Sequence, residues 1–399
     1  MPGFELFGEK EKKEVLDVLE SGILMRYGFD NLRNGHFKAR DLESEINKRL
    51  NVSYSQLASS GTAAISMALA VAGIGAGDEV IIPSFTFVAS FEAVLLVGAI
   101  PIIVDIDDTL TLDIESVKKS ITSKTKAIMP VHMCGSMADM SALVKISNKH
   151  GLILIEDACQ AIGGTYNGIP LGTIGDLGCF SFDFVKTVTC GEGGVVVTNN
   201  KEFALKLDCF NDHGHDHIGN DRGAESHPHI GYNFRISELN SAVGLAQFRR
   251  MDEFLEIQKN NYTILRDALQ EIDSITFRTV PKGGVESYAF LNFYLNDAQI
   301  AKAVARSFSL SGIDSCFYYL DNNWHYIHNW NHLKEIKSLY PFPNELVKGL
   351  KYLKTKDFSK SDYYIGRNIS CLIKLSWTKD EVSERARIMV DCINAIIKN

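Results

Sequence analysis

The sequence lacks the features of a membrane protein, of a nucleic-acid-binding protein and of a small disulfide-rich domain. No apolar run reaches the roughly 18 residues that a membrane-spanning helix requires, and charge appears early, so we expect neither an anchor nor a signal peptide. The net charge is −8, and no block of Lys and Arg could follow nucleic-acid phosphates. The eight cysteines contain no CxxC pair and are expected to be reduced thiols. We therefore expect a cytoplasmic protein with neither nucleic acid nor membrane as a partner.

A GxGxxG turn that opens a helix after the first strand is also absent, which disfavours a dinucleotide-binding oxidoreductase. The stretch "GIGAGDE" at 73–79 precedes an expected strand instead of a helix. No internal repeat or low-complexity linker is found. With 399 residues, of which 45% are hydrophobic, the chain is long enough to form two packed units.

Between residues 51 and 200, short β-branched apolar runs alternate with amphipathic stretches, which is typical of an α/β domain with a parallel sheet. Runs such as "LILIEDA" are apolar on both faces, so helices should cover both sides of the sheet. Helices are expected to begin near residues 61, 89, 113 and 137. The expected strands are 79–84, 100–106, 126–133, 152–158, 178–183 and 193–199.

The sequence pattern changes near residue 250, where apolar residues occur at helical spacing in "RRMDEFLEIQKNNYTILRDALQEI". This stretch predicts one long amphipathic helix that leaves the sheet. We expect residues 1–250, the N-terminal segment included, to form a large domain. Residues 251–399 should form a smaller α+β domain.

Ligands of an open parallel sheet bind beyond the carboxyl ends of its strands, and several polar residues fall there. "SSGTAA" (59–64) places Ser60, Gly61 and Thr62 at a helix start, whose N–H groups could bind a phosphate or could merely be capped by a hydroxyl. Asp157 ends a buried strand and needs a donor, either a cationic ligand or the neighbouring backbone.

Lys186, in "SFDFVKTVTCGEGG", follows another strand and precedes a glycine cluster. A partly buried lysine loses proton affinity and becomes a usable nucleophile, although a solvated loop lysine is the commoner case. Pyridoxal 5'-phosphate would account for all three features. It has a phosphate for the helix start, a protonated ring nitrogen for Asp157 and an aldehyde for Lys186.

Seven ordered segments resemble the DegT/DnrJ/EryC1/StrS family of sugar aminotransferases, a branch of the fold-type I superfamily. The resemblance extends over nearly the whole chain. It implies a large domain with a mostly parallel seven-stranded sheet, and pyridoxal 5'-phosphate-dependent transamination. The segments are "SSGTAA", "GDEVIIPSFTFVAS", "GAIPIIVDID", "KAIMPVHMCG", "IEDACQAIGGTYNG", "GTIGDLGCFSFDFVKTVTCGEGGVVVTN" and "GYNFRISELNSAVGLAQ".

By this resemblance, Lys186 forms the Schiff base with the cofactor and moves the proton during catalysis, and Asp157 pairs with the ring nitrogen. Phe87 matches the aromatic that stacks on the ring, although aromatics in such strands usually belong to the core. Gln160 matches the residue near the phenolic oxygen. Some relatives have a histidine in place of the lysine and dehydrate sugars, so Lys186 favours transamination.

The phosphate contacts of the family match Ser60, Gly61, Thr62 and Ser181. Asn233, in "GYNFR", matches a residue that the family supplies to the phosphate from the neighbouring subunit. The resemblance therefore implies a homodimer whose active sites are each completed by the other chain.

Three stretches resemble most closely the branch that makes 8-amino-3,8-dideoxy-manno-octulosonate for lipopolysaccharide. Glutamate would donate the amino group, leave as 2-oxoglutarate and give the pyridoxamine 5'-phosphate form, which then aminates C8 of 3,8-dideoxy-8-oxo-manno-octulosonate. The alternative is a nucleotide-linked keto-hexose, but "LMRYGFD" replaces the tryptophan and "GP" of that pattern. The three stretches are "MPGFELFGEKEKKEVLDVLESGILMRYGFD", "NDHGHDHIGNDRGAESHPHIGYNFRISE" and "CFYYLDNNWHYIHNW".

Both substrates carry carboxylates, for which Arg26, Arg222 and Arg235 are candidates, unless each merely pairs with an acidic side chain. His213 lies in the "DHG" that relatives place near the substrate. It alternates with His215 and His217, but no cysteine or carboxylate pair has matching spacing, so we expect no metal site.

The stretch Trp324 to Tyr326 could cover the sugar or simply pack against it. A cofactor-binding regulator without turnover is the non-enzymatic alternative. No helix-turn-helix segment or basic flank supports that alternative.

Overall fold

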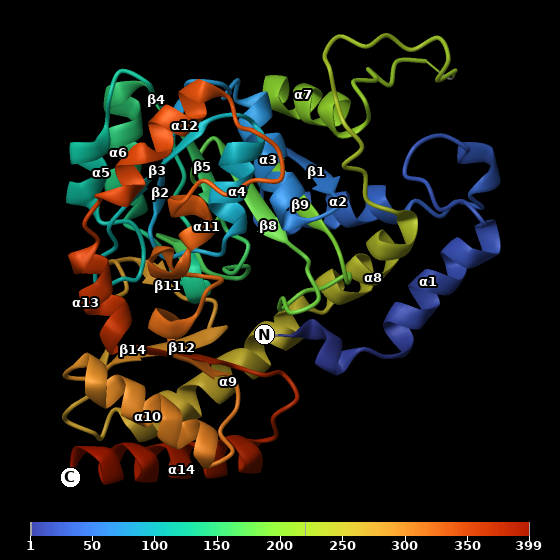
Figure 1. Cartoon of the computed structure of the whole chain (residues 1–399). Helices are drawn as coiled ribbons and strands as arrows, with labels where there is room; N and C mark the ends of the chain where they lie inside the picture. The colour runs from blue at the N-terminus through green and yellow to red at the C-terminus, as the bar shows by residue number, and fades with distance from the viewer. Residues whose placement is uncertain (1, 220, 399) are drawn as a thin grey trace.

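The computed structural model describes residues 2–219 and 221–398, and a seven-stranded sheet lies at its centre (Figure 1). Its strands are β1 (Tyr54–Ala58), β2 (Glu79–Pro83), β3 (Ile100–Val104), β4 (Thr125–Ile128), β5 (Ile153–Asp157), β8 (Leu177–Ser181) and β9 (Gly194–Thr198), in the order β1-β9-β8-β5-β4-β2-β3. β9 runs antiparallel to β1 and β8, and the other neighbouring pairs are parallel. The expected mostly parallel seven-stranded sheet is confirmed.

The six strands expected from the sequence are all present, with shorter ends. The expected strand 126–133 is regular only to Ile128, and beyond it Val131 still forms a single parallel bridge with Asp157 at the end of β5. β1 was not anticipated. Its sequence "YSQLA" is half polar, and it becomes a strand through its antiparallel pairing with β9, far along the chain.

Both faces of the sheet are apolar and covered. Val80 and Ile82 of β2 pack in one core, whereas Ile81 between them packs in another. Successive side chains of a strand point to opposite faces, so this alternation is the mark of a sheet that is buried on both sides. The expectation drawn from the apolar strand runs is therefore confirmed.

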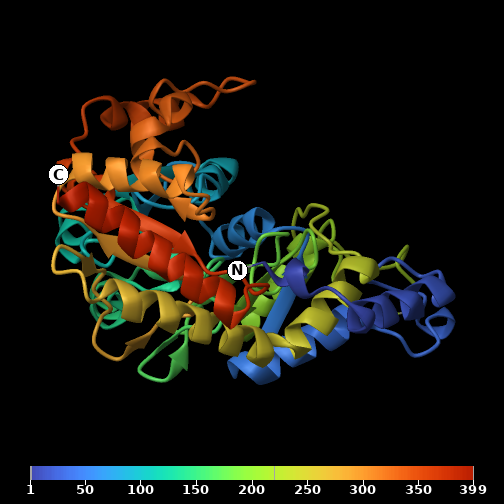
Figure 2. The ribbon, with the colours of Figure 1, turned by 90° about the horizontal axis from the view of Figure 1, so that it is seen from below.

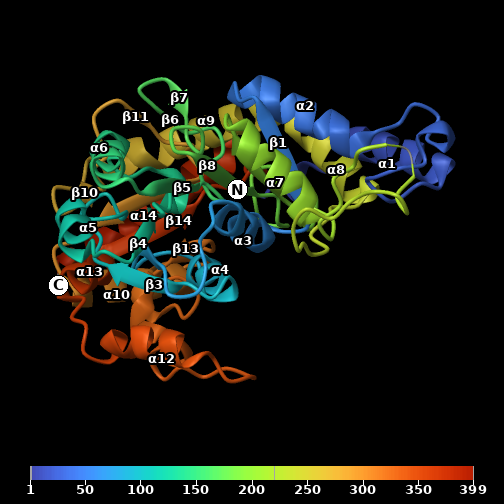
Figure 3. The same ribbon diagram turned by 90° about the horizontal axis from the view of Figure 1, so that it is seen from above.

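Helices of the first 250 residues surround this sheet, and three of the expected starts have side-chain caps. Ser60 accepts from the N–H of Ala63 at 3.0 Å, Asp113 from Ser116 at 3.1 Å and Asp139 from Ala142 at 3.0 Å. Seen from above, α2 and α8 lie side by side with α1 next to α8 (Figure 3). The helices are α1 (Glu9–Ser21), α2 (Lys38–Leu50), α3 (Gly61–Val71), α4 (Ala89–Leu96), α5 (Ile114–Ser120), α6 (Met140–His150), α7 (Lys201–Asn211) and α8 (Glu238–Arg249).

The C-terminal part is a smaller α+β unit, as expected. Its antiparallel sheet has the order β10 (Thr276–Phe277), β12 (Phe290–Tyr294), β14 (Asn368–Leu372) and β13 (Cys316–Phe317). The long helix expected near residue 250 is α9 (Met251–Leu269), and α14 (Lys379–Ile397) packs beside it and beside α10 (Ala298–Leu310) (Figure 2). The other helices are α11 (Asn331–Lys334), α12 (Asn344–Leu350) and α13 (Ser359–Arg367).

Contacts cross between the two parts of the chain at several places. β11 (Gly284–Val285) pairs with β6 (Thr165–Tyr166), which also pairs with β7 (Ile169–Pro170). Tyr326, Trp330 and Leu350 are buried in the same core as α3 and α4. The division at residue 250 stays a prediction.

Short 3₁₀ segments are Gly3–Leu6, Asp30–Leu32, Met133–Gly135, Tyr319–Asp321, Ile327–Asn329 and Lys351–Lys354.

All eight cysteines lie in the described part of the chain, and all are free thiols. Within the same residues, no helix combines the length and apolar character needed to cross a membrane.

Candidate active site

The start of α3 offers unpaired backbone donors. Ser60 caps the helix through its hydroxyl, while the N–H groups of Gly61 and Thr62 make no hydrogen bond with any residue that the structure describes. These amides and the positive end of the helix dipole create a site for an anion. A Cβ on Gly61 would lie 2.8 Å from the Cβ of Ser181, so only glycine lets the helix start approach the end of β8 this closely.

Asp157 ends β5 as a carboxylate that is 4% exposed. The Ser90 hydroxyl donates to its Oδ2 at 2.8 Å, and the N–H of Cys159 donates to its Oδ1 at 3.2 Å. Among the described residues no cation pairs with it. A buried carboxylate that has only neutral donors can still accept a strong hydrogen bond from a charged N–H group.

The neighbouring Glu156 points to the other face of the sheet and is fully committed. It accepts from the N–H groups of Gly172 at 2.9 Å and Ile174 at 2.6 Å, and its Oε2 lies 2.8 Å from Nε2 of His132. Glu156 therefore supports the loop before β8, and only Asp157 keeps free acceptor capacity.

Lys186 lies on the connection between β8 and β9. This connection is held at its base, where Phe182 donates to the carbonyl of Gly193 and accepts from the N–H of Cys190, both at 2.9 Å. The Lys186 side chain is half-buried, and its ammonium makes no hydrogen bond or ion pair with the described residues. Burial raises the pKa of the Cys159 thiol and lowers that of the His325 imidazole, and the charge of Lys186 acts to lower both, so it lies within electrostatic range of both side chains.

Phe87 presents an aromatic face near the lysine. Its ring is 40% exposed and lies 5.4 Å from the ring of His325. Two backbone hydrogen bonds of 2.9 Å, from Thr86 to His325 and from Val88 to Trp324, join the two segments. Burial, assisted by the charge of Lys186, lowers the pKa of His325 to about 4, so this imidazole is neutral at pH 7.

Gln160 has one end of its amide occupied. The N–H of Cys134 donates to its Oε1 at 3.0 Å. An amide oxygen must face this donor, so the Nε2 hydrogens point elsewhere, and they have no partner in the described part of the chain.

These groups together fit pyridoxal 5'-phosphate. The α3 start suits the phosphate, Asp157 the ring nitrogen, Lys186 the aldehyde, Phe87 the ring face and Gln160 the phenolic oxygen. The two cavities of about 400 Å³ lie elsewhere, one beside α2 and α7 and the other beside α9. Phe184 and Val185, which precede Lys186 in the chain, are exposed apolar side chains.

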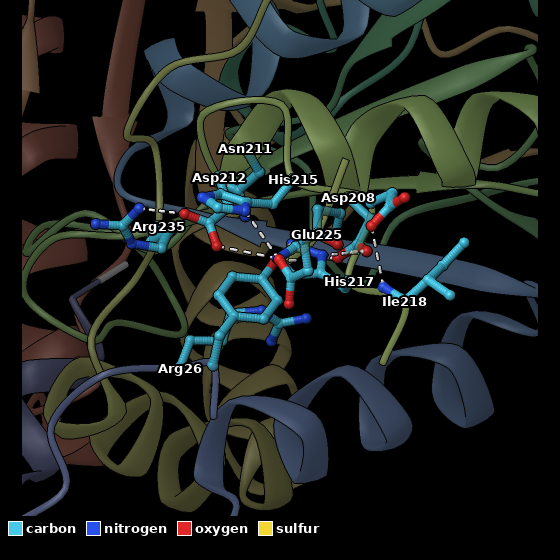
Figure 4. Close-up of polar contacts among 12 residues, drawn as sticks. Arg26, Asp208, Asn211, Asp212, His215, His217, Ile218, Glu225 and Arg235 are labelled. Atoms are coloured by element: carbon cyan, nitrogen blue, oxygen red, sulfur yellow. Dashed lines mark hydrogen bonds and ion pairs between the residues drawn. The ribbon is translucent and has the colours of Figure 1, made fainter. Parts of the chain in front are cut away.

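Two of the arginines expected to bind substrate pair with one buried acid, Asp212, which Figure 4 shows with Arg235 and His217. Nη1 of Arg222 lies 2.8 Å from Oδ2 of Asp212, Arg235 pairs with Oδ1, and Nε2 of His217 lies 2.9 Å from Oδ2. Although burial opposes ionisation, the hydrogen bonds from His217 and Arg222 hold the pKa of Asp212 well below its usual range. Nδ1 of His217 also pairs with Asp208 at 2.7 Å.

Arg26 lies next to this Asp212 cluster. The ring of Tyr27 stacks on His217 at 4.1 Å and has the Arg26 guanidinium 5.1 Å from its centre. Nη2 of Arg26 lies 2.8 Å from Oε2 of Glu43, while its Nε and Nη1 are buried without a partner among the described residues. The substrate roles of Arg26, Arg222 and Arg235 stay predictions.

His213 is exposed and Asn233 lies opposite Asp212 in a single antiparallel bridge, with its side chain at the surface. His213 and His217 have positive φ angles of 53° and 51°, so this stretch turns instead of extending as the alternation required. Nδ1 of His215 faces Glu225 at 2.8 Å. The described residues contain no group of three or more side chains arranged to hold a metal.

Sequence reasoning missed Ser90 and Cys134, and it left the position of His325 open. Ser90 belongs to the quoted segment "SFTFVAS", so its place in the motif was a usable signal. Cys134 acts through a backbone N–H in a turn with positive φ, which no residue type announces.

Comparisons with known proteins identify the family and the fold of this chain. The model of the DegT/DnrJ/EryC1/StrS aminotransferase family matches residues 6–348. A GDP-perosamine synthase of Caulobacter vibrioides is 42% identical over 196 residues, 49% of this chain and 52% of that protein. A UDP-N-acetyl-3-dehydro-alpha-D-glucosamine 3-aminotransferase of Acidithiobacillus ferrooxidans is 36% identical over 284 residues, 71% of this chain and 74% of that protein. The solved structure of 3-amino-5-hydroxybenzoic acid synthase superimposes with a TM-score of 0.81 at 27% identity, covering 98% and 97% of the two chains.

Proposed function

Because the chain belongs to the DegT/DnrJ/EryC1/StrS aminotransferase family, we propose that it moves an amino group from glutamate to C8 of 3,8-dideoxy-8-oxo-manno-octulosonate. The protein is a pyridoxal 5'-phosphate-dependent sugar aminotransferase. The donor and the octulosonate are our proposal. So is the product, 8-amino-3,8-dideoxy-manno-octulosonate for lipopolysaccharide.

The bound cofactor supplies an aldehyde that carries the amino group and a ring that accepts electrons from the substrate carbon. Lys186, whose amine has no partner among the described residues, would hold the aldehyde and would serve as the acid and base for the proton at the substrate carbon. Asp157 accepts the ring N–H and keeps that nitrogen charged. Phe87 covers one ring face, and Gln160 donates its amide hydrogens to the phenolic oxygen.

We place the phosphate at the start of α3, where hydrogen-bond donors are available. We assign it to the hydroxyls of Ser60, Thr62 and Ser181 and to the N–H groups of Gly61 and Thr62. The start of α3 should stabilise a doubly charged phosphate strongly, because its backbone amides and the helix dipole both favour an anion there.

One observation carries the octulosonate proposal: two of the three branch-specific segments meet in the fold. The Tyr27 ring of the first segment stacks on His217 of the second at 4.1 Å, and the Tyr27 hydroxyl donates to Asp208 at 3.0 Å. The third segment contributes His325, which faces Phe87. These contacts between the first two segments, and that of the third with Phe87, support our proposal that the three segments form one acceptor site.

The substrate carboxylates are assigned to the surroundings of the Asp212 cluster. Two guanidinium nitrogens of Arg26 have no partner among the described residues, whereas the charges of Arg222 and Arg235 are already balanced by Asp212. We propose that all three arginines and His213 lie on the substrate side, with Arg26 the one that keeps unsatisfied donors.

A second acceptor, a nucleotide-linked keto-hexose, is favoured by the similarity to GDP-perosamine synthase. A single-turnover assay separates the two acceptors. The pyridoxamine 5'-phosphate form is offered each substrate, and return of the aldehyde form is followed by absorbance, with Lys186→Ala as the inactive control. Return with the octulosonate alone supports the proposal. Return with the nucleotide sugar alone overturns it.

We also propose a homodimer in which Asn233 completes the neighbouring phosphate site. Its exposed side chain has no protein partner in the described residues, and the apolar side chains of Phe184 and Val185, next to Lys186 in the chain, are exposed. Mixed dimers of Lys186→Ala and Asn233→Ala chains provide the test. One site of each mixed dimer would be intact if Asn233 acts across the interface, so mixing two inactive proteins should recover about a quarter of wild-type activity. No recovery would show that Asn233 serves its own chain.

A further inference from the structure

Arg278 is a buried cation that joins the C-terminal part of the chain to the turn beside Gln160. It follows β10, is 6% exposed and pairs with Glu286, to which its Nε donates at 2.7 Å. The Tyr262 hydroxyl donates to the other oxygen of Glu286 at 3.1 Å. This arrangement balances the charge and fixes the plane of the guanidinium.

The remaining donors of Arg278 hold two consecutive carbonyls. Nη1 donates to Met133 at 3.0 Å and Nη2 to Cys134 at 2.6 Å. These residues belong to the 133–135 turn, in which Cys134 has φ 55° and Gly135 has φ 75°. A non-glycine residue in this region costs free energy, so the turn persists only because its surroundings hold it.

The 133–135 turn fixes the orientation of the Gln160 side-chain amide. The N–H of Cys134 is the only donor to Oε1 of Gln160 among the described residues. If the turn relaxed, this N–H would move away, and the amide of Gln160 could rotate or exchange its oxygen and nitrogen. A carbonyl oxygen aimed at the phenolic oxygen would repel it, whereas the Nε2 hydrogens donate to it.

We propose that Arg278 is a positioning residue: it holds the 133–135 turn, and through this turn it fixes Gln160 against the cofactor. The inference rests on the proposed function, because it takes Gln160 as the contact of the phenolic oxygen. Arg278 itself touches neither substrate nor cofactor. Its effect must therefore pass entirely through Gln160.

The test is an absorbance titration of the bound cofactor against pH. Losing the donor from Gln160 makes the phenolic oxygen more basic, so Gln160→Ala should raise the titration midpoint by about one pH unit. Arg278→Lys keeps a charge beside Glu286 but cannot hold both carbonyls, and it should raise the midpoint by about half a unit. Arg367→Lys is the matched control, because Arg367 also donates to a carbonyl, that of Leu295 at 2.8 Å, away from Gln160.

A double-mutant cycle tests whether Arg278 acts on the cofactor through Gln160. In the Gln160→Ala background, Arg278→Lys should produce no further shift. A shift of equal size in both backgrounds, or none in either, overturns the inference while leaving the cofactor contact intact. If Gln160→Ala binds the cofactor with an unchanged midpoint, the proposed contact itself fails, and the role of Arg278 fails with it.

A milder variant protects the test against misfolding. If Arg278→Lys does not fold, Tyr262→Phe preserves the Arg278 and Glu286 charges and removes only the hydroxyl that orients Glu286. Tyr262→Phe should raise the midpoint by a few tenths of a unit in wild type and not in Gln160→Ala. The absence of any shift in wild type would overturn the inference.

Discussion

Replacing Gly194 by Ala tests whether the start of α3 holds the cofactor phosphate. β9 begins at Gly194 against the backbone of the helix start. A Cβ there would lie 2.3 Å from the carbonyl oxygen and 2.6 Å from the carbonyl carbon of Ser60, and 2.9 Å from the nitrogen of Gly61. Favourable contacts between carbon atoms begin near ~3.5 Å, so the two backbones must separate by about 1 Å. No flexible side chain can absorb this movement.

The Gly194→Ala substitution should lower both the stability of the protein and its affinity for the cofactor. Inserting a methyl group into a packed site typically lowers the free energy of unfolding by about 1 to 3 kcal/mol. A displacement of about 1 Å also spoils the hydrogen bonds from Gly61 and Thr62 to the phosphate, each worth about 1.5 to 3 kcal/mol because the acceptor is charged. Since about 1.4 kcal/mol is a factor of ten, the cofactor Kd should rise about 10- to 100-fold.

Cofactor-free protein titrated with pyridoxal 5'-phosphate gives the Kd, and urea unfolding of the same samples gives the stability. Gly75→Ala is the matched control, because its nearest neighbour would be the Val97 carbonyl oxygen at 3.8 Å. That variant should keep the wild-type Kd and gain a few tenths of a kcal/mol in stability, since alanine restricts the unfolded chain. Equal Kd values for the two variants would refute the phosphate assignment.

Three further outcomes are expected. Lys186→Ala should fold and lose transamination, and borohydride reduction with peptide mapping should label residue 186 in wild type alone; normal turnover in the variant would disprove its role. Asp157→Asn should slow the single-turnover rate about 10- to 100-fold, because a charged hydrogen bond is lost, while circular dichroism stays unchanged; an unaltered rate would contradict the assignment. Burial lowers the pKa of His217, but hydrogen bonds with Asp208 and Asp212 outweigh burial and raise it to about 9. The resulting stability is complete below about pH 6.5 and is lost as the pH rises through 9, so urea unfolding should show the wild-type advantage over His217→Gln falling by about 1 kcal/mol, after allowance for solvent screening, between about pH 6 and 10. A constant advantage would exclude a charged His217.

The sequence predicted the sheet well where local physics determines it. Strands such as β5 are β-branched and apolar throughout, and helix starts such as those at Ser60 and Asp113 have capping side chains. β1 was not predicted as a strand, because its residues are half polar and its pairing partner lies at 194–198. A strand that forms through distant pairing leaves little signal in its own residues.

The site was predictable to the extent that it consists of contiguous motifs. Lys186, Asp157 and the α3 start each follow a strand, and the fold of parallel sheets brings such positions to one edge. The Arg278 contacts join segments far apart in sequence, and the ion pairs of Asp212 depend on how the 212–235 loop folds back on itself. No spacing rule relates these partners, so only the folded chain reveals them.

The connection that carries Lys186 has a consequence for how the protein is made. β8 and β9 are neighbours both along the chain and in the sheet, so their pairing closes a short loop at small entropic expense. The pairing of β9 with β1 joins Thr198 to Tyr54, which are far apart along the chain, so it closes a much longer loop. We therefore expect the hairpin that carries Lys186 to form before β9 pairs with β1 and brings Gly194 against the start of α3, so cofactor binding should require the later of the two pairings.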